Sequence, residues 1–178
     1  MNQTATFTGV DVETAIRTRR THKQYDAEPV EEGVVRELVE LARWAPNHKL
    51  TNPWRFRVLG PEIRARIEEA AGEKEAAKLR RAPTLVLVTA VCSDEPELAQ
   101  EDLHATACAV YAILLGATAR GLASYWRTPA CFREDEVRGL VGLAANEVVV
   151  ALVHLGRPGG EPPAKERAPV HNVLTVLP

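Results

Sequence analysis

Two stretches of this sequence are almost wholly apolar and rich in β-branched residues, and they constrain the fold more than any other feature. Residues 84–91 (TLVLVTAV) and 147–155 (EVVVALVHL) show no regular alternation of apolar and polar side chains. Strands of this composition have to be covered on both faces. Residues 98–120 predict a long helix whose middle is apolar nearly all round, which places it in the core or at a subunit interface.

The remaining periodicity predicts a layered domain. Apolar positions three or four residues apart predict helices, and short alternating runs predict strands. The expected helices lie at 11–19, with Asp11 as the cap, at 31–45, at 61–81 as one or two surface helices, and at 133–142; the expected shorter strands lie at 55–59 and 122–126. In the first of these strands Arg55 and Arg57 should point outward. Strands separated by helices around a long central helix predict an α+β fold.

The C-terminal segment differs in composition from the rest of the chain. A length of 178 residues fits one domain, 1–178, of which 156–178 would form an extended arm. The arm ends in VHNVLTVL (170–177), where apolar side chains alternate. One interpretation packs the arm on its own subunit. The preferred one adds it to the sheet of a second copy, with the helix at 98–120 at the interface, because a monomer of this size has little need of such an arm.

Residues 41–56 (LARWAPNHKLTNPWRF) combine an apolar helix end, a proline and a polar loop in a short space. Pro46 stops the helix, because its ring clashes with the preceding turn and it lacks an N–H. Residues 47–52 are mostly polar and the chain then becomes apolar again. Such a donor-rich loop suits a flat ligand with polar edges, and a solvated connection is an equal alternative.

Three further parts of the sequence bear on the role of this loop. They are 19–26 (RRTHKQYD), 121–128 (GLASYWRT), and the pair 155–158 (LGRP) and 163–167 (PAKER). With the A-P-x-H-K pattern of the loop, they resemble, in order and over nearly the whole chain, the nitroreductase family of FMN-dependent NAD(P)H oxidoreductases. The combination with W-R-[ST] is similar to the short, minimal subgroup of that family.

The resemblance implies a nitroreductase-like layered fold, in which helices flank a central, mostly antiparallel sheet. It also implies an intertwined homodimer that exchanges its C-terminal arms and holds two FMN molecules at the interface. The implied activity is reduction of nitroaromatics, quinones or similar electron-poor small molecules, with NAD(P)H as hydride donor and a ping-pong mechanism. A dimer that binds FMN without turnover, as a flavin store or redox sensor, is the alternative.

The phosphate of FMN needs fixed cations, and an arginine guanidinium matches its oxygens best. From the residues alone, Arg19 and Arg20 are a solvated helix end, and Lys165 and Arg167 belong to a linker. The resemblance instead places both pairs around the phosphate and the ribityl chain. It also places Thr21 as a hydrogen-bond partner of that end.

The flavin ring implies a second set of contacts by resemblance. Lys23 takes the position of a cation beside the pyrimidine edge, where negative charge develops on reduction. His22 and Gln24 depart from the family pattern on either side of it. The ring face would be packed by Trp44, His48, Trp126 and the backbone of Arg127 and Thr128. Contact of His48 with the phosphate end, from the partner chain, is an alternative. Core packing is the alternative for Trp44 and Trp126. No residue has to act as a nucleophile or obligatory base, because the cofactor carries the chemistry.

Composition bounds the partners and the compartment. The net charge is −2 with both signs interspersed, which gives no support for a nucleic-acid partner. The three scattered cysteines and five isolated histidines form no metal-binding motif. The odd number of cysteines, without a disulfide pattern, favours a reducing compartment. The N-terminus lacks the charged start and apolar run of a signal peptide, and no uninterrupted apolar stretch reaches the roughly 20 residues of a membrane helix. We therefore expect a cytoplasmic protein.

Overall fold

A computed structural model describes residues 10–178, so the first nine residues of the predicted domain and N-terminal segment lie outside it. Four strands form one antiparallel sheet in the order β1-β2-β4-β3. They are β1 (Trp54–Val58), β2 (Thr84–Val91), β3 (Ala123–Arg127) and β4 (Glu147–Gly156). The helices are α1 (Val12–Thr18), α2 (Glu32–Ala42), α3 (Pro61–Ala71), α4 (Glu73–Leu79), α5 (Pro96–Ala119) and α6 (Asp135–Leu140). The predicted α+β fold is confirmed.

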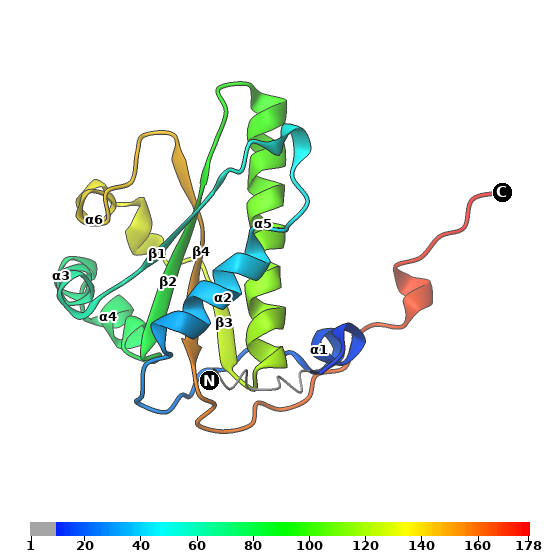
Figure 1. Ribbon diagram of the computed structural model, residues 1–178, viewed down its shortest axis with the longest axis horizontal. Coiled ribbons are helices and arrows are strands. Elements are labelled where there is room, and N and C mark those ends of the chain that lie inside the picture. Colours follow the sequence, from blue (N-terminus) through cyan, green and yellow to red (C-terminus); the bar gives the residue numbers. More distant parts are fainter. Residues whose placement is uncertain (1–9) are drawn as a thin grey trace, which may run out of the picture.

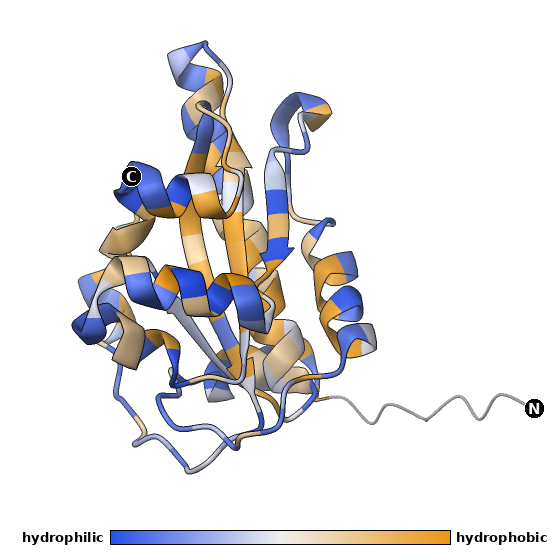
Figure 2. Cartoon of the chain, turned by 90° about the vertical axis from the view of Figure 1, so that its left-hand side faces the viewer, coloured by the Kyte–Doolittle hydropathy of each residue, from blue (hydrophilic) through white to orange (hydrophobic). Residues whose placement is uncertain are grey.

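The sheet lies between two layers of helices (Figure 1). On one face α2 and α5 pack against alternate strand residues such as Val86 and Val153, which belong to one core. On the other face Leu85 and Leu87 join a second core with residues of α3, α4 and α6. In Figure 2 the apolar residues gather accordingly along the inner strands, and the outer sides of the surrounding helices are largely hydrophilic. The inner strands β2 and β4 are thus covered on both faces, as their composition predicts.

The long helix α5 is the main support of the first core. Ala109, Val110 and Ile113 are buried along it. A Cβ on Gly116 would come within 2.9 Å of the side chains of Leu38 and Leu41, so glycine permits the close approach of α2. By length and composition alone α5 could cross a membrane, but half of its most apolar window is buried within the protein, as in many core helices.

The helix ends follow the expected local chemistry. Asp11 caps α1, because its carboxylate accepts hydrogen bonds from the backbone N–H (3.0 Å) and the hydroxyl (2.7 Å) of Thr14. Gly121 follows α5 with a φ of 68°, a conformation that glycine adopts without strain. By contrast, α2 ends at Ala42, three residues before the predicted boundary at 45. Two turn-type hydrogen bonds, from Trp44 and Ala45, replace its last turn before the proline.

The prediction that Arg57 points outward is wrong. Its guanidinium forms a bidentate ion pair with Glu147, at 2.7 and 2.8 Å, and also donates to the Thr89 hydroxyl. Instead Val58 is 56% exposed on this edge strand. The reason is that Glu147 is buried at the start of β4, where a cation and hydrogen-bond donors offset the cost of burying its charge.

The C-terminal arm leaves the body of the protein (Figure 1). Beyond a short 3₁₀ turn at Val170–Asn172, it contains no regular element. Val173 and Val176 are 80% and 85% exposed, so the apolar end of the arm does not pack on its own subunit. This result leaves its apolar side chains without a partner in the described part of the chain.

Glu147→Gln should destabilise the protein in a pH-dependent way. The Arg57 guanidinium, with help from Thr89, lowers the pKa of Glu147 from 4.5 to about 2. A lowered carboxyl pKa stabilises the fold above pH 4.5, and this contribution is lost as the pH falls toward 2. The variant should lose about 3 kcal/mol of unfolding free energy at pH 7. Urea unfolding at pH 7 and at pH 3 measures this loss, with the exposed Glu134→Gln as control; a loss that did not shrink at pH 3 would contradict the prediction.

Candidate cofactor-binding site

Residues 19–26 lie along the edge of the sheet. Thr21 bridges to Ser124 of β3, and the backbone N–H of His22 donates to the Ser124 carbonyl at 3.1 Å. Farther along, Tyr25 bridges to Pro158 just beyond β4. The Tyr25 hydroxyl donates back to the His22 carbonyl at 2.9 Å, and burial raises the pKa of Tyr25, so this donor stays protonated. The segment is therefore held at both ends and covers the outer edge of β3.

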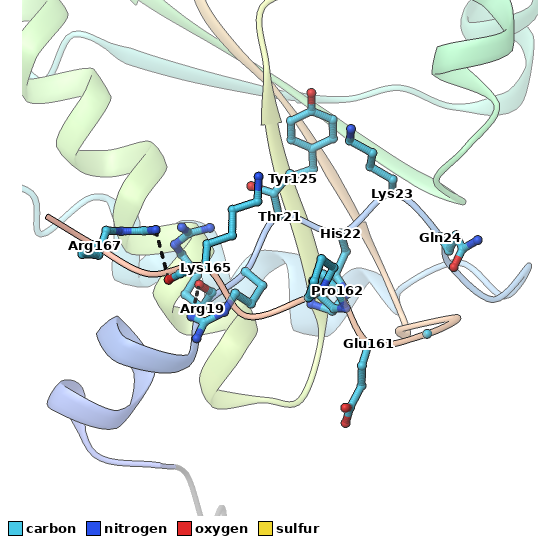
Figure 3. Close-up of a pocket in the computed structure, with 13 residues that line it drawn as sticks. Arg19, Thr21, His22, Lys23, Gln24, Tyr125, Glu161, Pro162, Lys165 and Arg167 are labelled. Atoms are coloured by element: carbon cyan, nitrogen blue, oxygen red, sulfur yellow. Dashed lines mark hydrogen bonds between the residues drawn. The ribbon is translucent and has the colours of Figure 1, made fainter.

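A pocket of about 650 Å³ opens beside this segment (Figure 3). Its walls come from segment 19–24, from Tyr125 of β3 and from the tail that follows β4. The lining residues are Arg19, Arg20, Thr21, His22, Lys23, Gln24, Tyr125, Gly160, Glu161, Pro162, Pro163, Lys165 and Arg167. The structure thus brings together in one place all six of the predicted residues that come from the N-terminal segment and the tail.

The charges of this pocket are unbalanced. Glu161 is the one carboxylate among the lining residues, against five lysine and arginine side chains. Arg19, Lys23 and Lys165 form no ion pair and no side-chain hydrogen bond within residues 10–178. In Figure 3, Arg19, Lys165 and Arg167 gather at one end, and Lys23 lies beside Tyr125 at the other. Cations without counter-ions in a pocket indicate an anionic ligand.

The guanidinium groups of the other two arginines, Arg20 and Arg167, donate some of their hydrogen bonds to backbone carbonyls. Arg20 donates to the carbonyls of Arg17 (2.6 Å) and Arg19 (3.0 Å), at the C-terminal end of α1. Arg167 makes weak contacts with the carbonyls of Lys165 and Glu166, at 3.5 and 3.4 Å. Both side chains line the pocket and have further N–H donors for a ligand. Arg20 in addition binds backbone carbonyls at the C-terminal end of α1.

Tyr125 lines the pocket and was missed in the sequence. Strand alternation gives the signal that could have found it: in GLASYWRT, neighbours on β3 point to opposite faces, so Tyr125 and Trp126 cannot share one site. The Tyr125 ring lies 5.8 Å from that of His154, which is fully buried, with neither ring nitrogen bonded to a described residue. Burial, and then the positive charge of Arg127, lowers the pKa of His154 to about 3. The group behind Tyr125 is therefore neutral.

The remaining predicted residues lie elsewhere in the chain. Trp126 packs on the first core, and its indole donates to the Val150 carbonyl at 3.0 Å. Arg127 is on the opposite face and pairs with Glu75 of α4 at 3.3 Å. Thr128 is exposed at the end of β3. None of the three lines the cationic pocket.

Trp44 and His48 are also separate from the pocket. Trp44 is 80% exposed and borders a shallow apolar depression, here called the α2–α5 patch, formed by Leu41, Trp44, Cys108, Tyr111, Leu115 and Trp126. His48 lies on the loop beside the N-terminal end of α5, 4.0 Å from Glu101. In Figure 1 that end of α5 is opposite to the one near segment 19–26. Six of the predicted residues therefore line the pocket, and five lie apart from it: Trp44 and Trp126 at the α2–α5 patch, His48 on the loop, and Arg127 and Thr128 at the end of β3.

The nitroreductase family model matches residues 16–78 and 71–157, which together cover most of the sequence. The chain belongs to the nitroreductase family. This result confirms the family inferred from the four sequence segments, and the length of the chain fits the short subgroup.

Individual nitroreductases agree with this assignment. YfhC of Bacillus subtilis, provisionally named an NAD(P)H nitroreductase, is 27% identical over 91% of this chain and 92% of its own length. A nitroreductase-like protein of Bacillus cereus has the same fold, with a TM-score of 0.86 at 24% identity over 97% of this chain and 99% of that one. A provisionally named nitroreductase of Desulfovibrio desulfuricans, solved in complex with FMN, is 26% identical with a TM-score of 0.76, over 96% and 99% of the two chains.

His154→Leu should make the protein more resistant to acid. Because the folded-state pKa of about 3 lies below the ordinary 6.5, the unfolded chain binds the proton more tightly, and stability falls as the pH drops below 6.5. The wild type should lose about 1.4 kcal/mol per pH unit relative to the variant across that range. Urea unfolding between pH 7.5 and pH 4 measures the difference, with His104→Leu, at an exposed histidine, as control. Parallel pH curves for wild type and variant would show that His154 does not titrate in this way.

Proposed function

We propose that this protein is an FMN-dependent oxidoreductase that uses NAD(P)H to reduce nitroaromatics, quinones or similar electron-poor acceptors in a ping-pong cycle. The observation that carries the proposal is the pocket where Arg19, Lys23 and Lys165 form no ion pair with any residue between 10 and 178. The FMN-bound relative and the NAD(P)H nitroreductase name of YfhC support the cofactor and the reductant. We place the enzyme in the cytoplasm, as one domain over residues 1–178.

The donor set of the pocket fits FMN. We assign the phosphate to the part of the pocket lined by Arg19, Lys165 and Arg167, because these three cations form no ion pair within residues 10–178. Arg20 and Thr21 add donors on the ribityl side. Lys23, beside Tyr125 at the other end, provides a positive charge for the pyrimidine edge. Bound FMN would supply the chemistry by accepting hydride and passing it on; the side chains hold and polarise it.

One chain provides little apolar surface for the flat ring. Among the pocket's lining residues, Tyr125 and the prolines of the tail are the main apolar contributors. Of the residues predicted for the ring face, His48 lies beside the N-terminal end of α5, whose 24 residues span about 36 Å, and Trp44 lies nearer the middle of this helix. We propose that the loop with His48 acts in the pocket of a second copy, so that each cofactor is held by two chains, and that Trp44 packs where the two copies meet.

The surface of the protein supports such a pairing. The α2–α5 patch lies near the middle of α5, and Trp44 and Tyr111 on it are exposed. A twofold axis at this patch, perpendicular to α5, brings the N-terminal end of one α5 near the C-terminal end of the other. The loop with His48 then approaches the partner's cationic pocket, so that His48 and the six predicted residues of that pocket form one site.

The C-terminal arm has a matching acceptor. Within residues 10–178, β1 pairs only with β2, so its outer edge has free backbone groups. The edge of β3 is instead covered by residues 19–26 at Thr21. An arm with alternating apolar side chains can add to an open edge as a further strand. This pairing would cover the unpaired backbone groups of β1 and the exposed apolar side chains of the arm together. We propose that the two copies exchange arms in this way.

An absorbance spectrum of the purified protein tests the central proposal. We expect flavin bands, present as purified or after addition of FMN, that bleach when NADPH or NADH is added without oxygen. Subsequent addition of a quinone should restore them. Bands that persist with both reductants would leave a flavin store, and a protein that takes up no FMN would overturn the proposal.

Lys23→Ala should lower the midpoint potential of the bound flavin, because the cation stabilises the reduced form more than the oxidised form. Titration against a redox dye of known potential measures this change. Lys74→Ala, on the exposed face of α4, is the matched control and should leave the potential unchanged. Equal potentials for wild type and Lys23→Ala would remove Lys23 from this role.

Trp44→Glu should weaken the dimer, because it puts a carboxylate in the middle of an apolar contact. We expect the dissociation constant to rise at least about tenfold, which corresponds to 1.4 kcal/mol. Analytical ultracentrifugation over a concentration series measures it, with Val148→Glu, at an exposed valine on β4, as control. A dimer as stable as the wild type would show that the patch is not the interface.

A further inference from the structure

The loop at residues 47–52 has an unusual backbone. Three of its residues have positive φ angles without being glycine: Lys49 (53°), Leu50 (52°) and Asn52 (47°). Side chains with a Cβ rarely adopt this conformation, and it persists only where surrounding contacts impose it. One result is that Leu50 is 76% exposed, although leucine is ordinarily buried. The loop is therefore held in a shape that its own sequence does not prefer.

A chain of hydrogen bonds imposes this shape. The side chain of Asn47 spans the loop, because its Oδ1 accepts from the backbone N–H of Asn52 (2.7 Å) and its Nδ2 donates to the Thr51 hydroxyl (3.0 Å). The Thr51 hydroxyl in turn donates to Oδ1 of Asp102 on α5, at 2.6 Å. The loop is thus tied to the long helix through one hydroxyl group.

The burial of the Asp102 carboxylate costs free energy of folding. The residue is 2% exposed, and its second oxygen accepts only the backbone N–H of Ser93, at 3.1 Å. Glu147, the other buried carboxylate of the described chain, has an arginine partner, whereas no cation pairs with Asp102 within residues 10–178. A buried carboxylate with two donors and no cation contributes poorly to stability. Its direct structural effect is to fix Thr51 and hence the loop.

The position of the loop indicates what its shape serves. It lies at the N-terminal end of α5, remote from the cationic pocket of its own chain (Figure 1). In the paired arrangement proposed above, this end faces the pocket of the second copy. His48 and Lys49, both exposed, would then add positive charge next to an anionic cofactor.

We propose that Asp102 is a positioning residue, which acts through Thr51 and Asn47 to hold residues 47–52 preformed for contact with the FMN of a second copy. The inference rests on the proposed function, since it takes FMN as the ligand. A loop that is already ordered loses little entropy on binding, so its contacts contribute more fully to affinity. Neither Asp102 nor Thr51 has to touch the cofactor for this effect.

Thr51→Val tests the inference, because valine has nearly the shape of threonine but neither donates to Asp102 nor accepts from Asn47. Thr118→Val is the matched control, since the Thr118 hydroxyl bonds only within α5, to the Leu114 carbonyl at 2.9 Å. Two properties are measured: the FMN dissociation constant of the apoprotein, by fluorescence titration, and hydrogen–deuterium exchange of the amides at 47–52. Ultracentrifugation and thermal unfolding verify that the variants stay dimeric and folded.

We expect Thr51→Val to accelerate exchange at 47–52 and to raise the FMN dissociation constant roughly tenfold, with the dimer intact. Asp102→Asn, which keeps an accepting oxygen for Thr51, should change both properties less. Faster exchange with unchanged FMN affinity would overturn the inference, and so would unchanged exchange. Wild-type protein that binds no FMN would instead overturn the proposed function itself, whatever the variants do.

Discussion

The pairing of β2 with β4 is the constraint on which the rest of the structure depends. Both strands are apolar on both faces, so neither is stable unless helices cover the sheet from two sides. The long helix α5 covers one face together with α2, and three short helices cover the other. The outer strands β1 and β3 contribute fewer core residues and also carry polar side chains, and the cationic pocket lies beside β3.

The fold could be predicted from periodicity because its elements are strongly patterned. Residues 84–91 were predicted as a strand, and the structure gives the same bounds. Arg57 was predicted to point outward because local alternation cannot reveal a buried carboxylate that lies 90 residues away in sequence. The exact end of α2 could not be predicted from the sequence either, because turn-type hydrogen bonds end the helix before Pro46.

The candidate site could be predicted only in part. The residues of segment 19–26 and of the tail come together, because two backbone bridges tie both segments to the sheet edge. Tyr125 was missed because the motif was compared residue by residue, and the face of the strand on which each residue lies was not considered. Trp44 and His48 were predicted to pack on the flavin ring, and both lie outside the pocket. Their role in the site of a second copy is a proposal, because no pattern within one sequence positions a second chain.

The open edge of β1 has a consequence for assembly. If each chain has one arm and one acceptor edge, exchange between two copies closes on itself, but an arm that reached a third copy would start an open-ended chain. Residues 158–169, which precede the exposed end of the arm, contain four prolines. Proline restricts the directions in which a connecting segment can leave the body. In the arm exchange proposed above, such a restriction would favour the closed pair over growth into polymers.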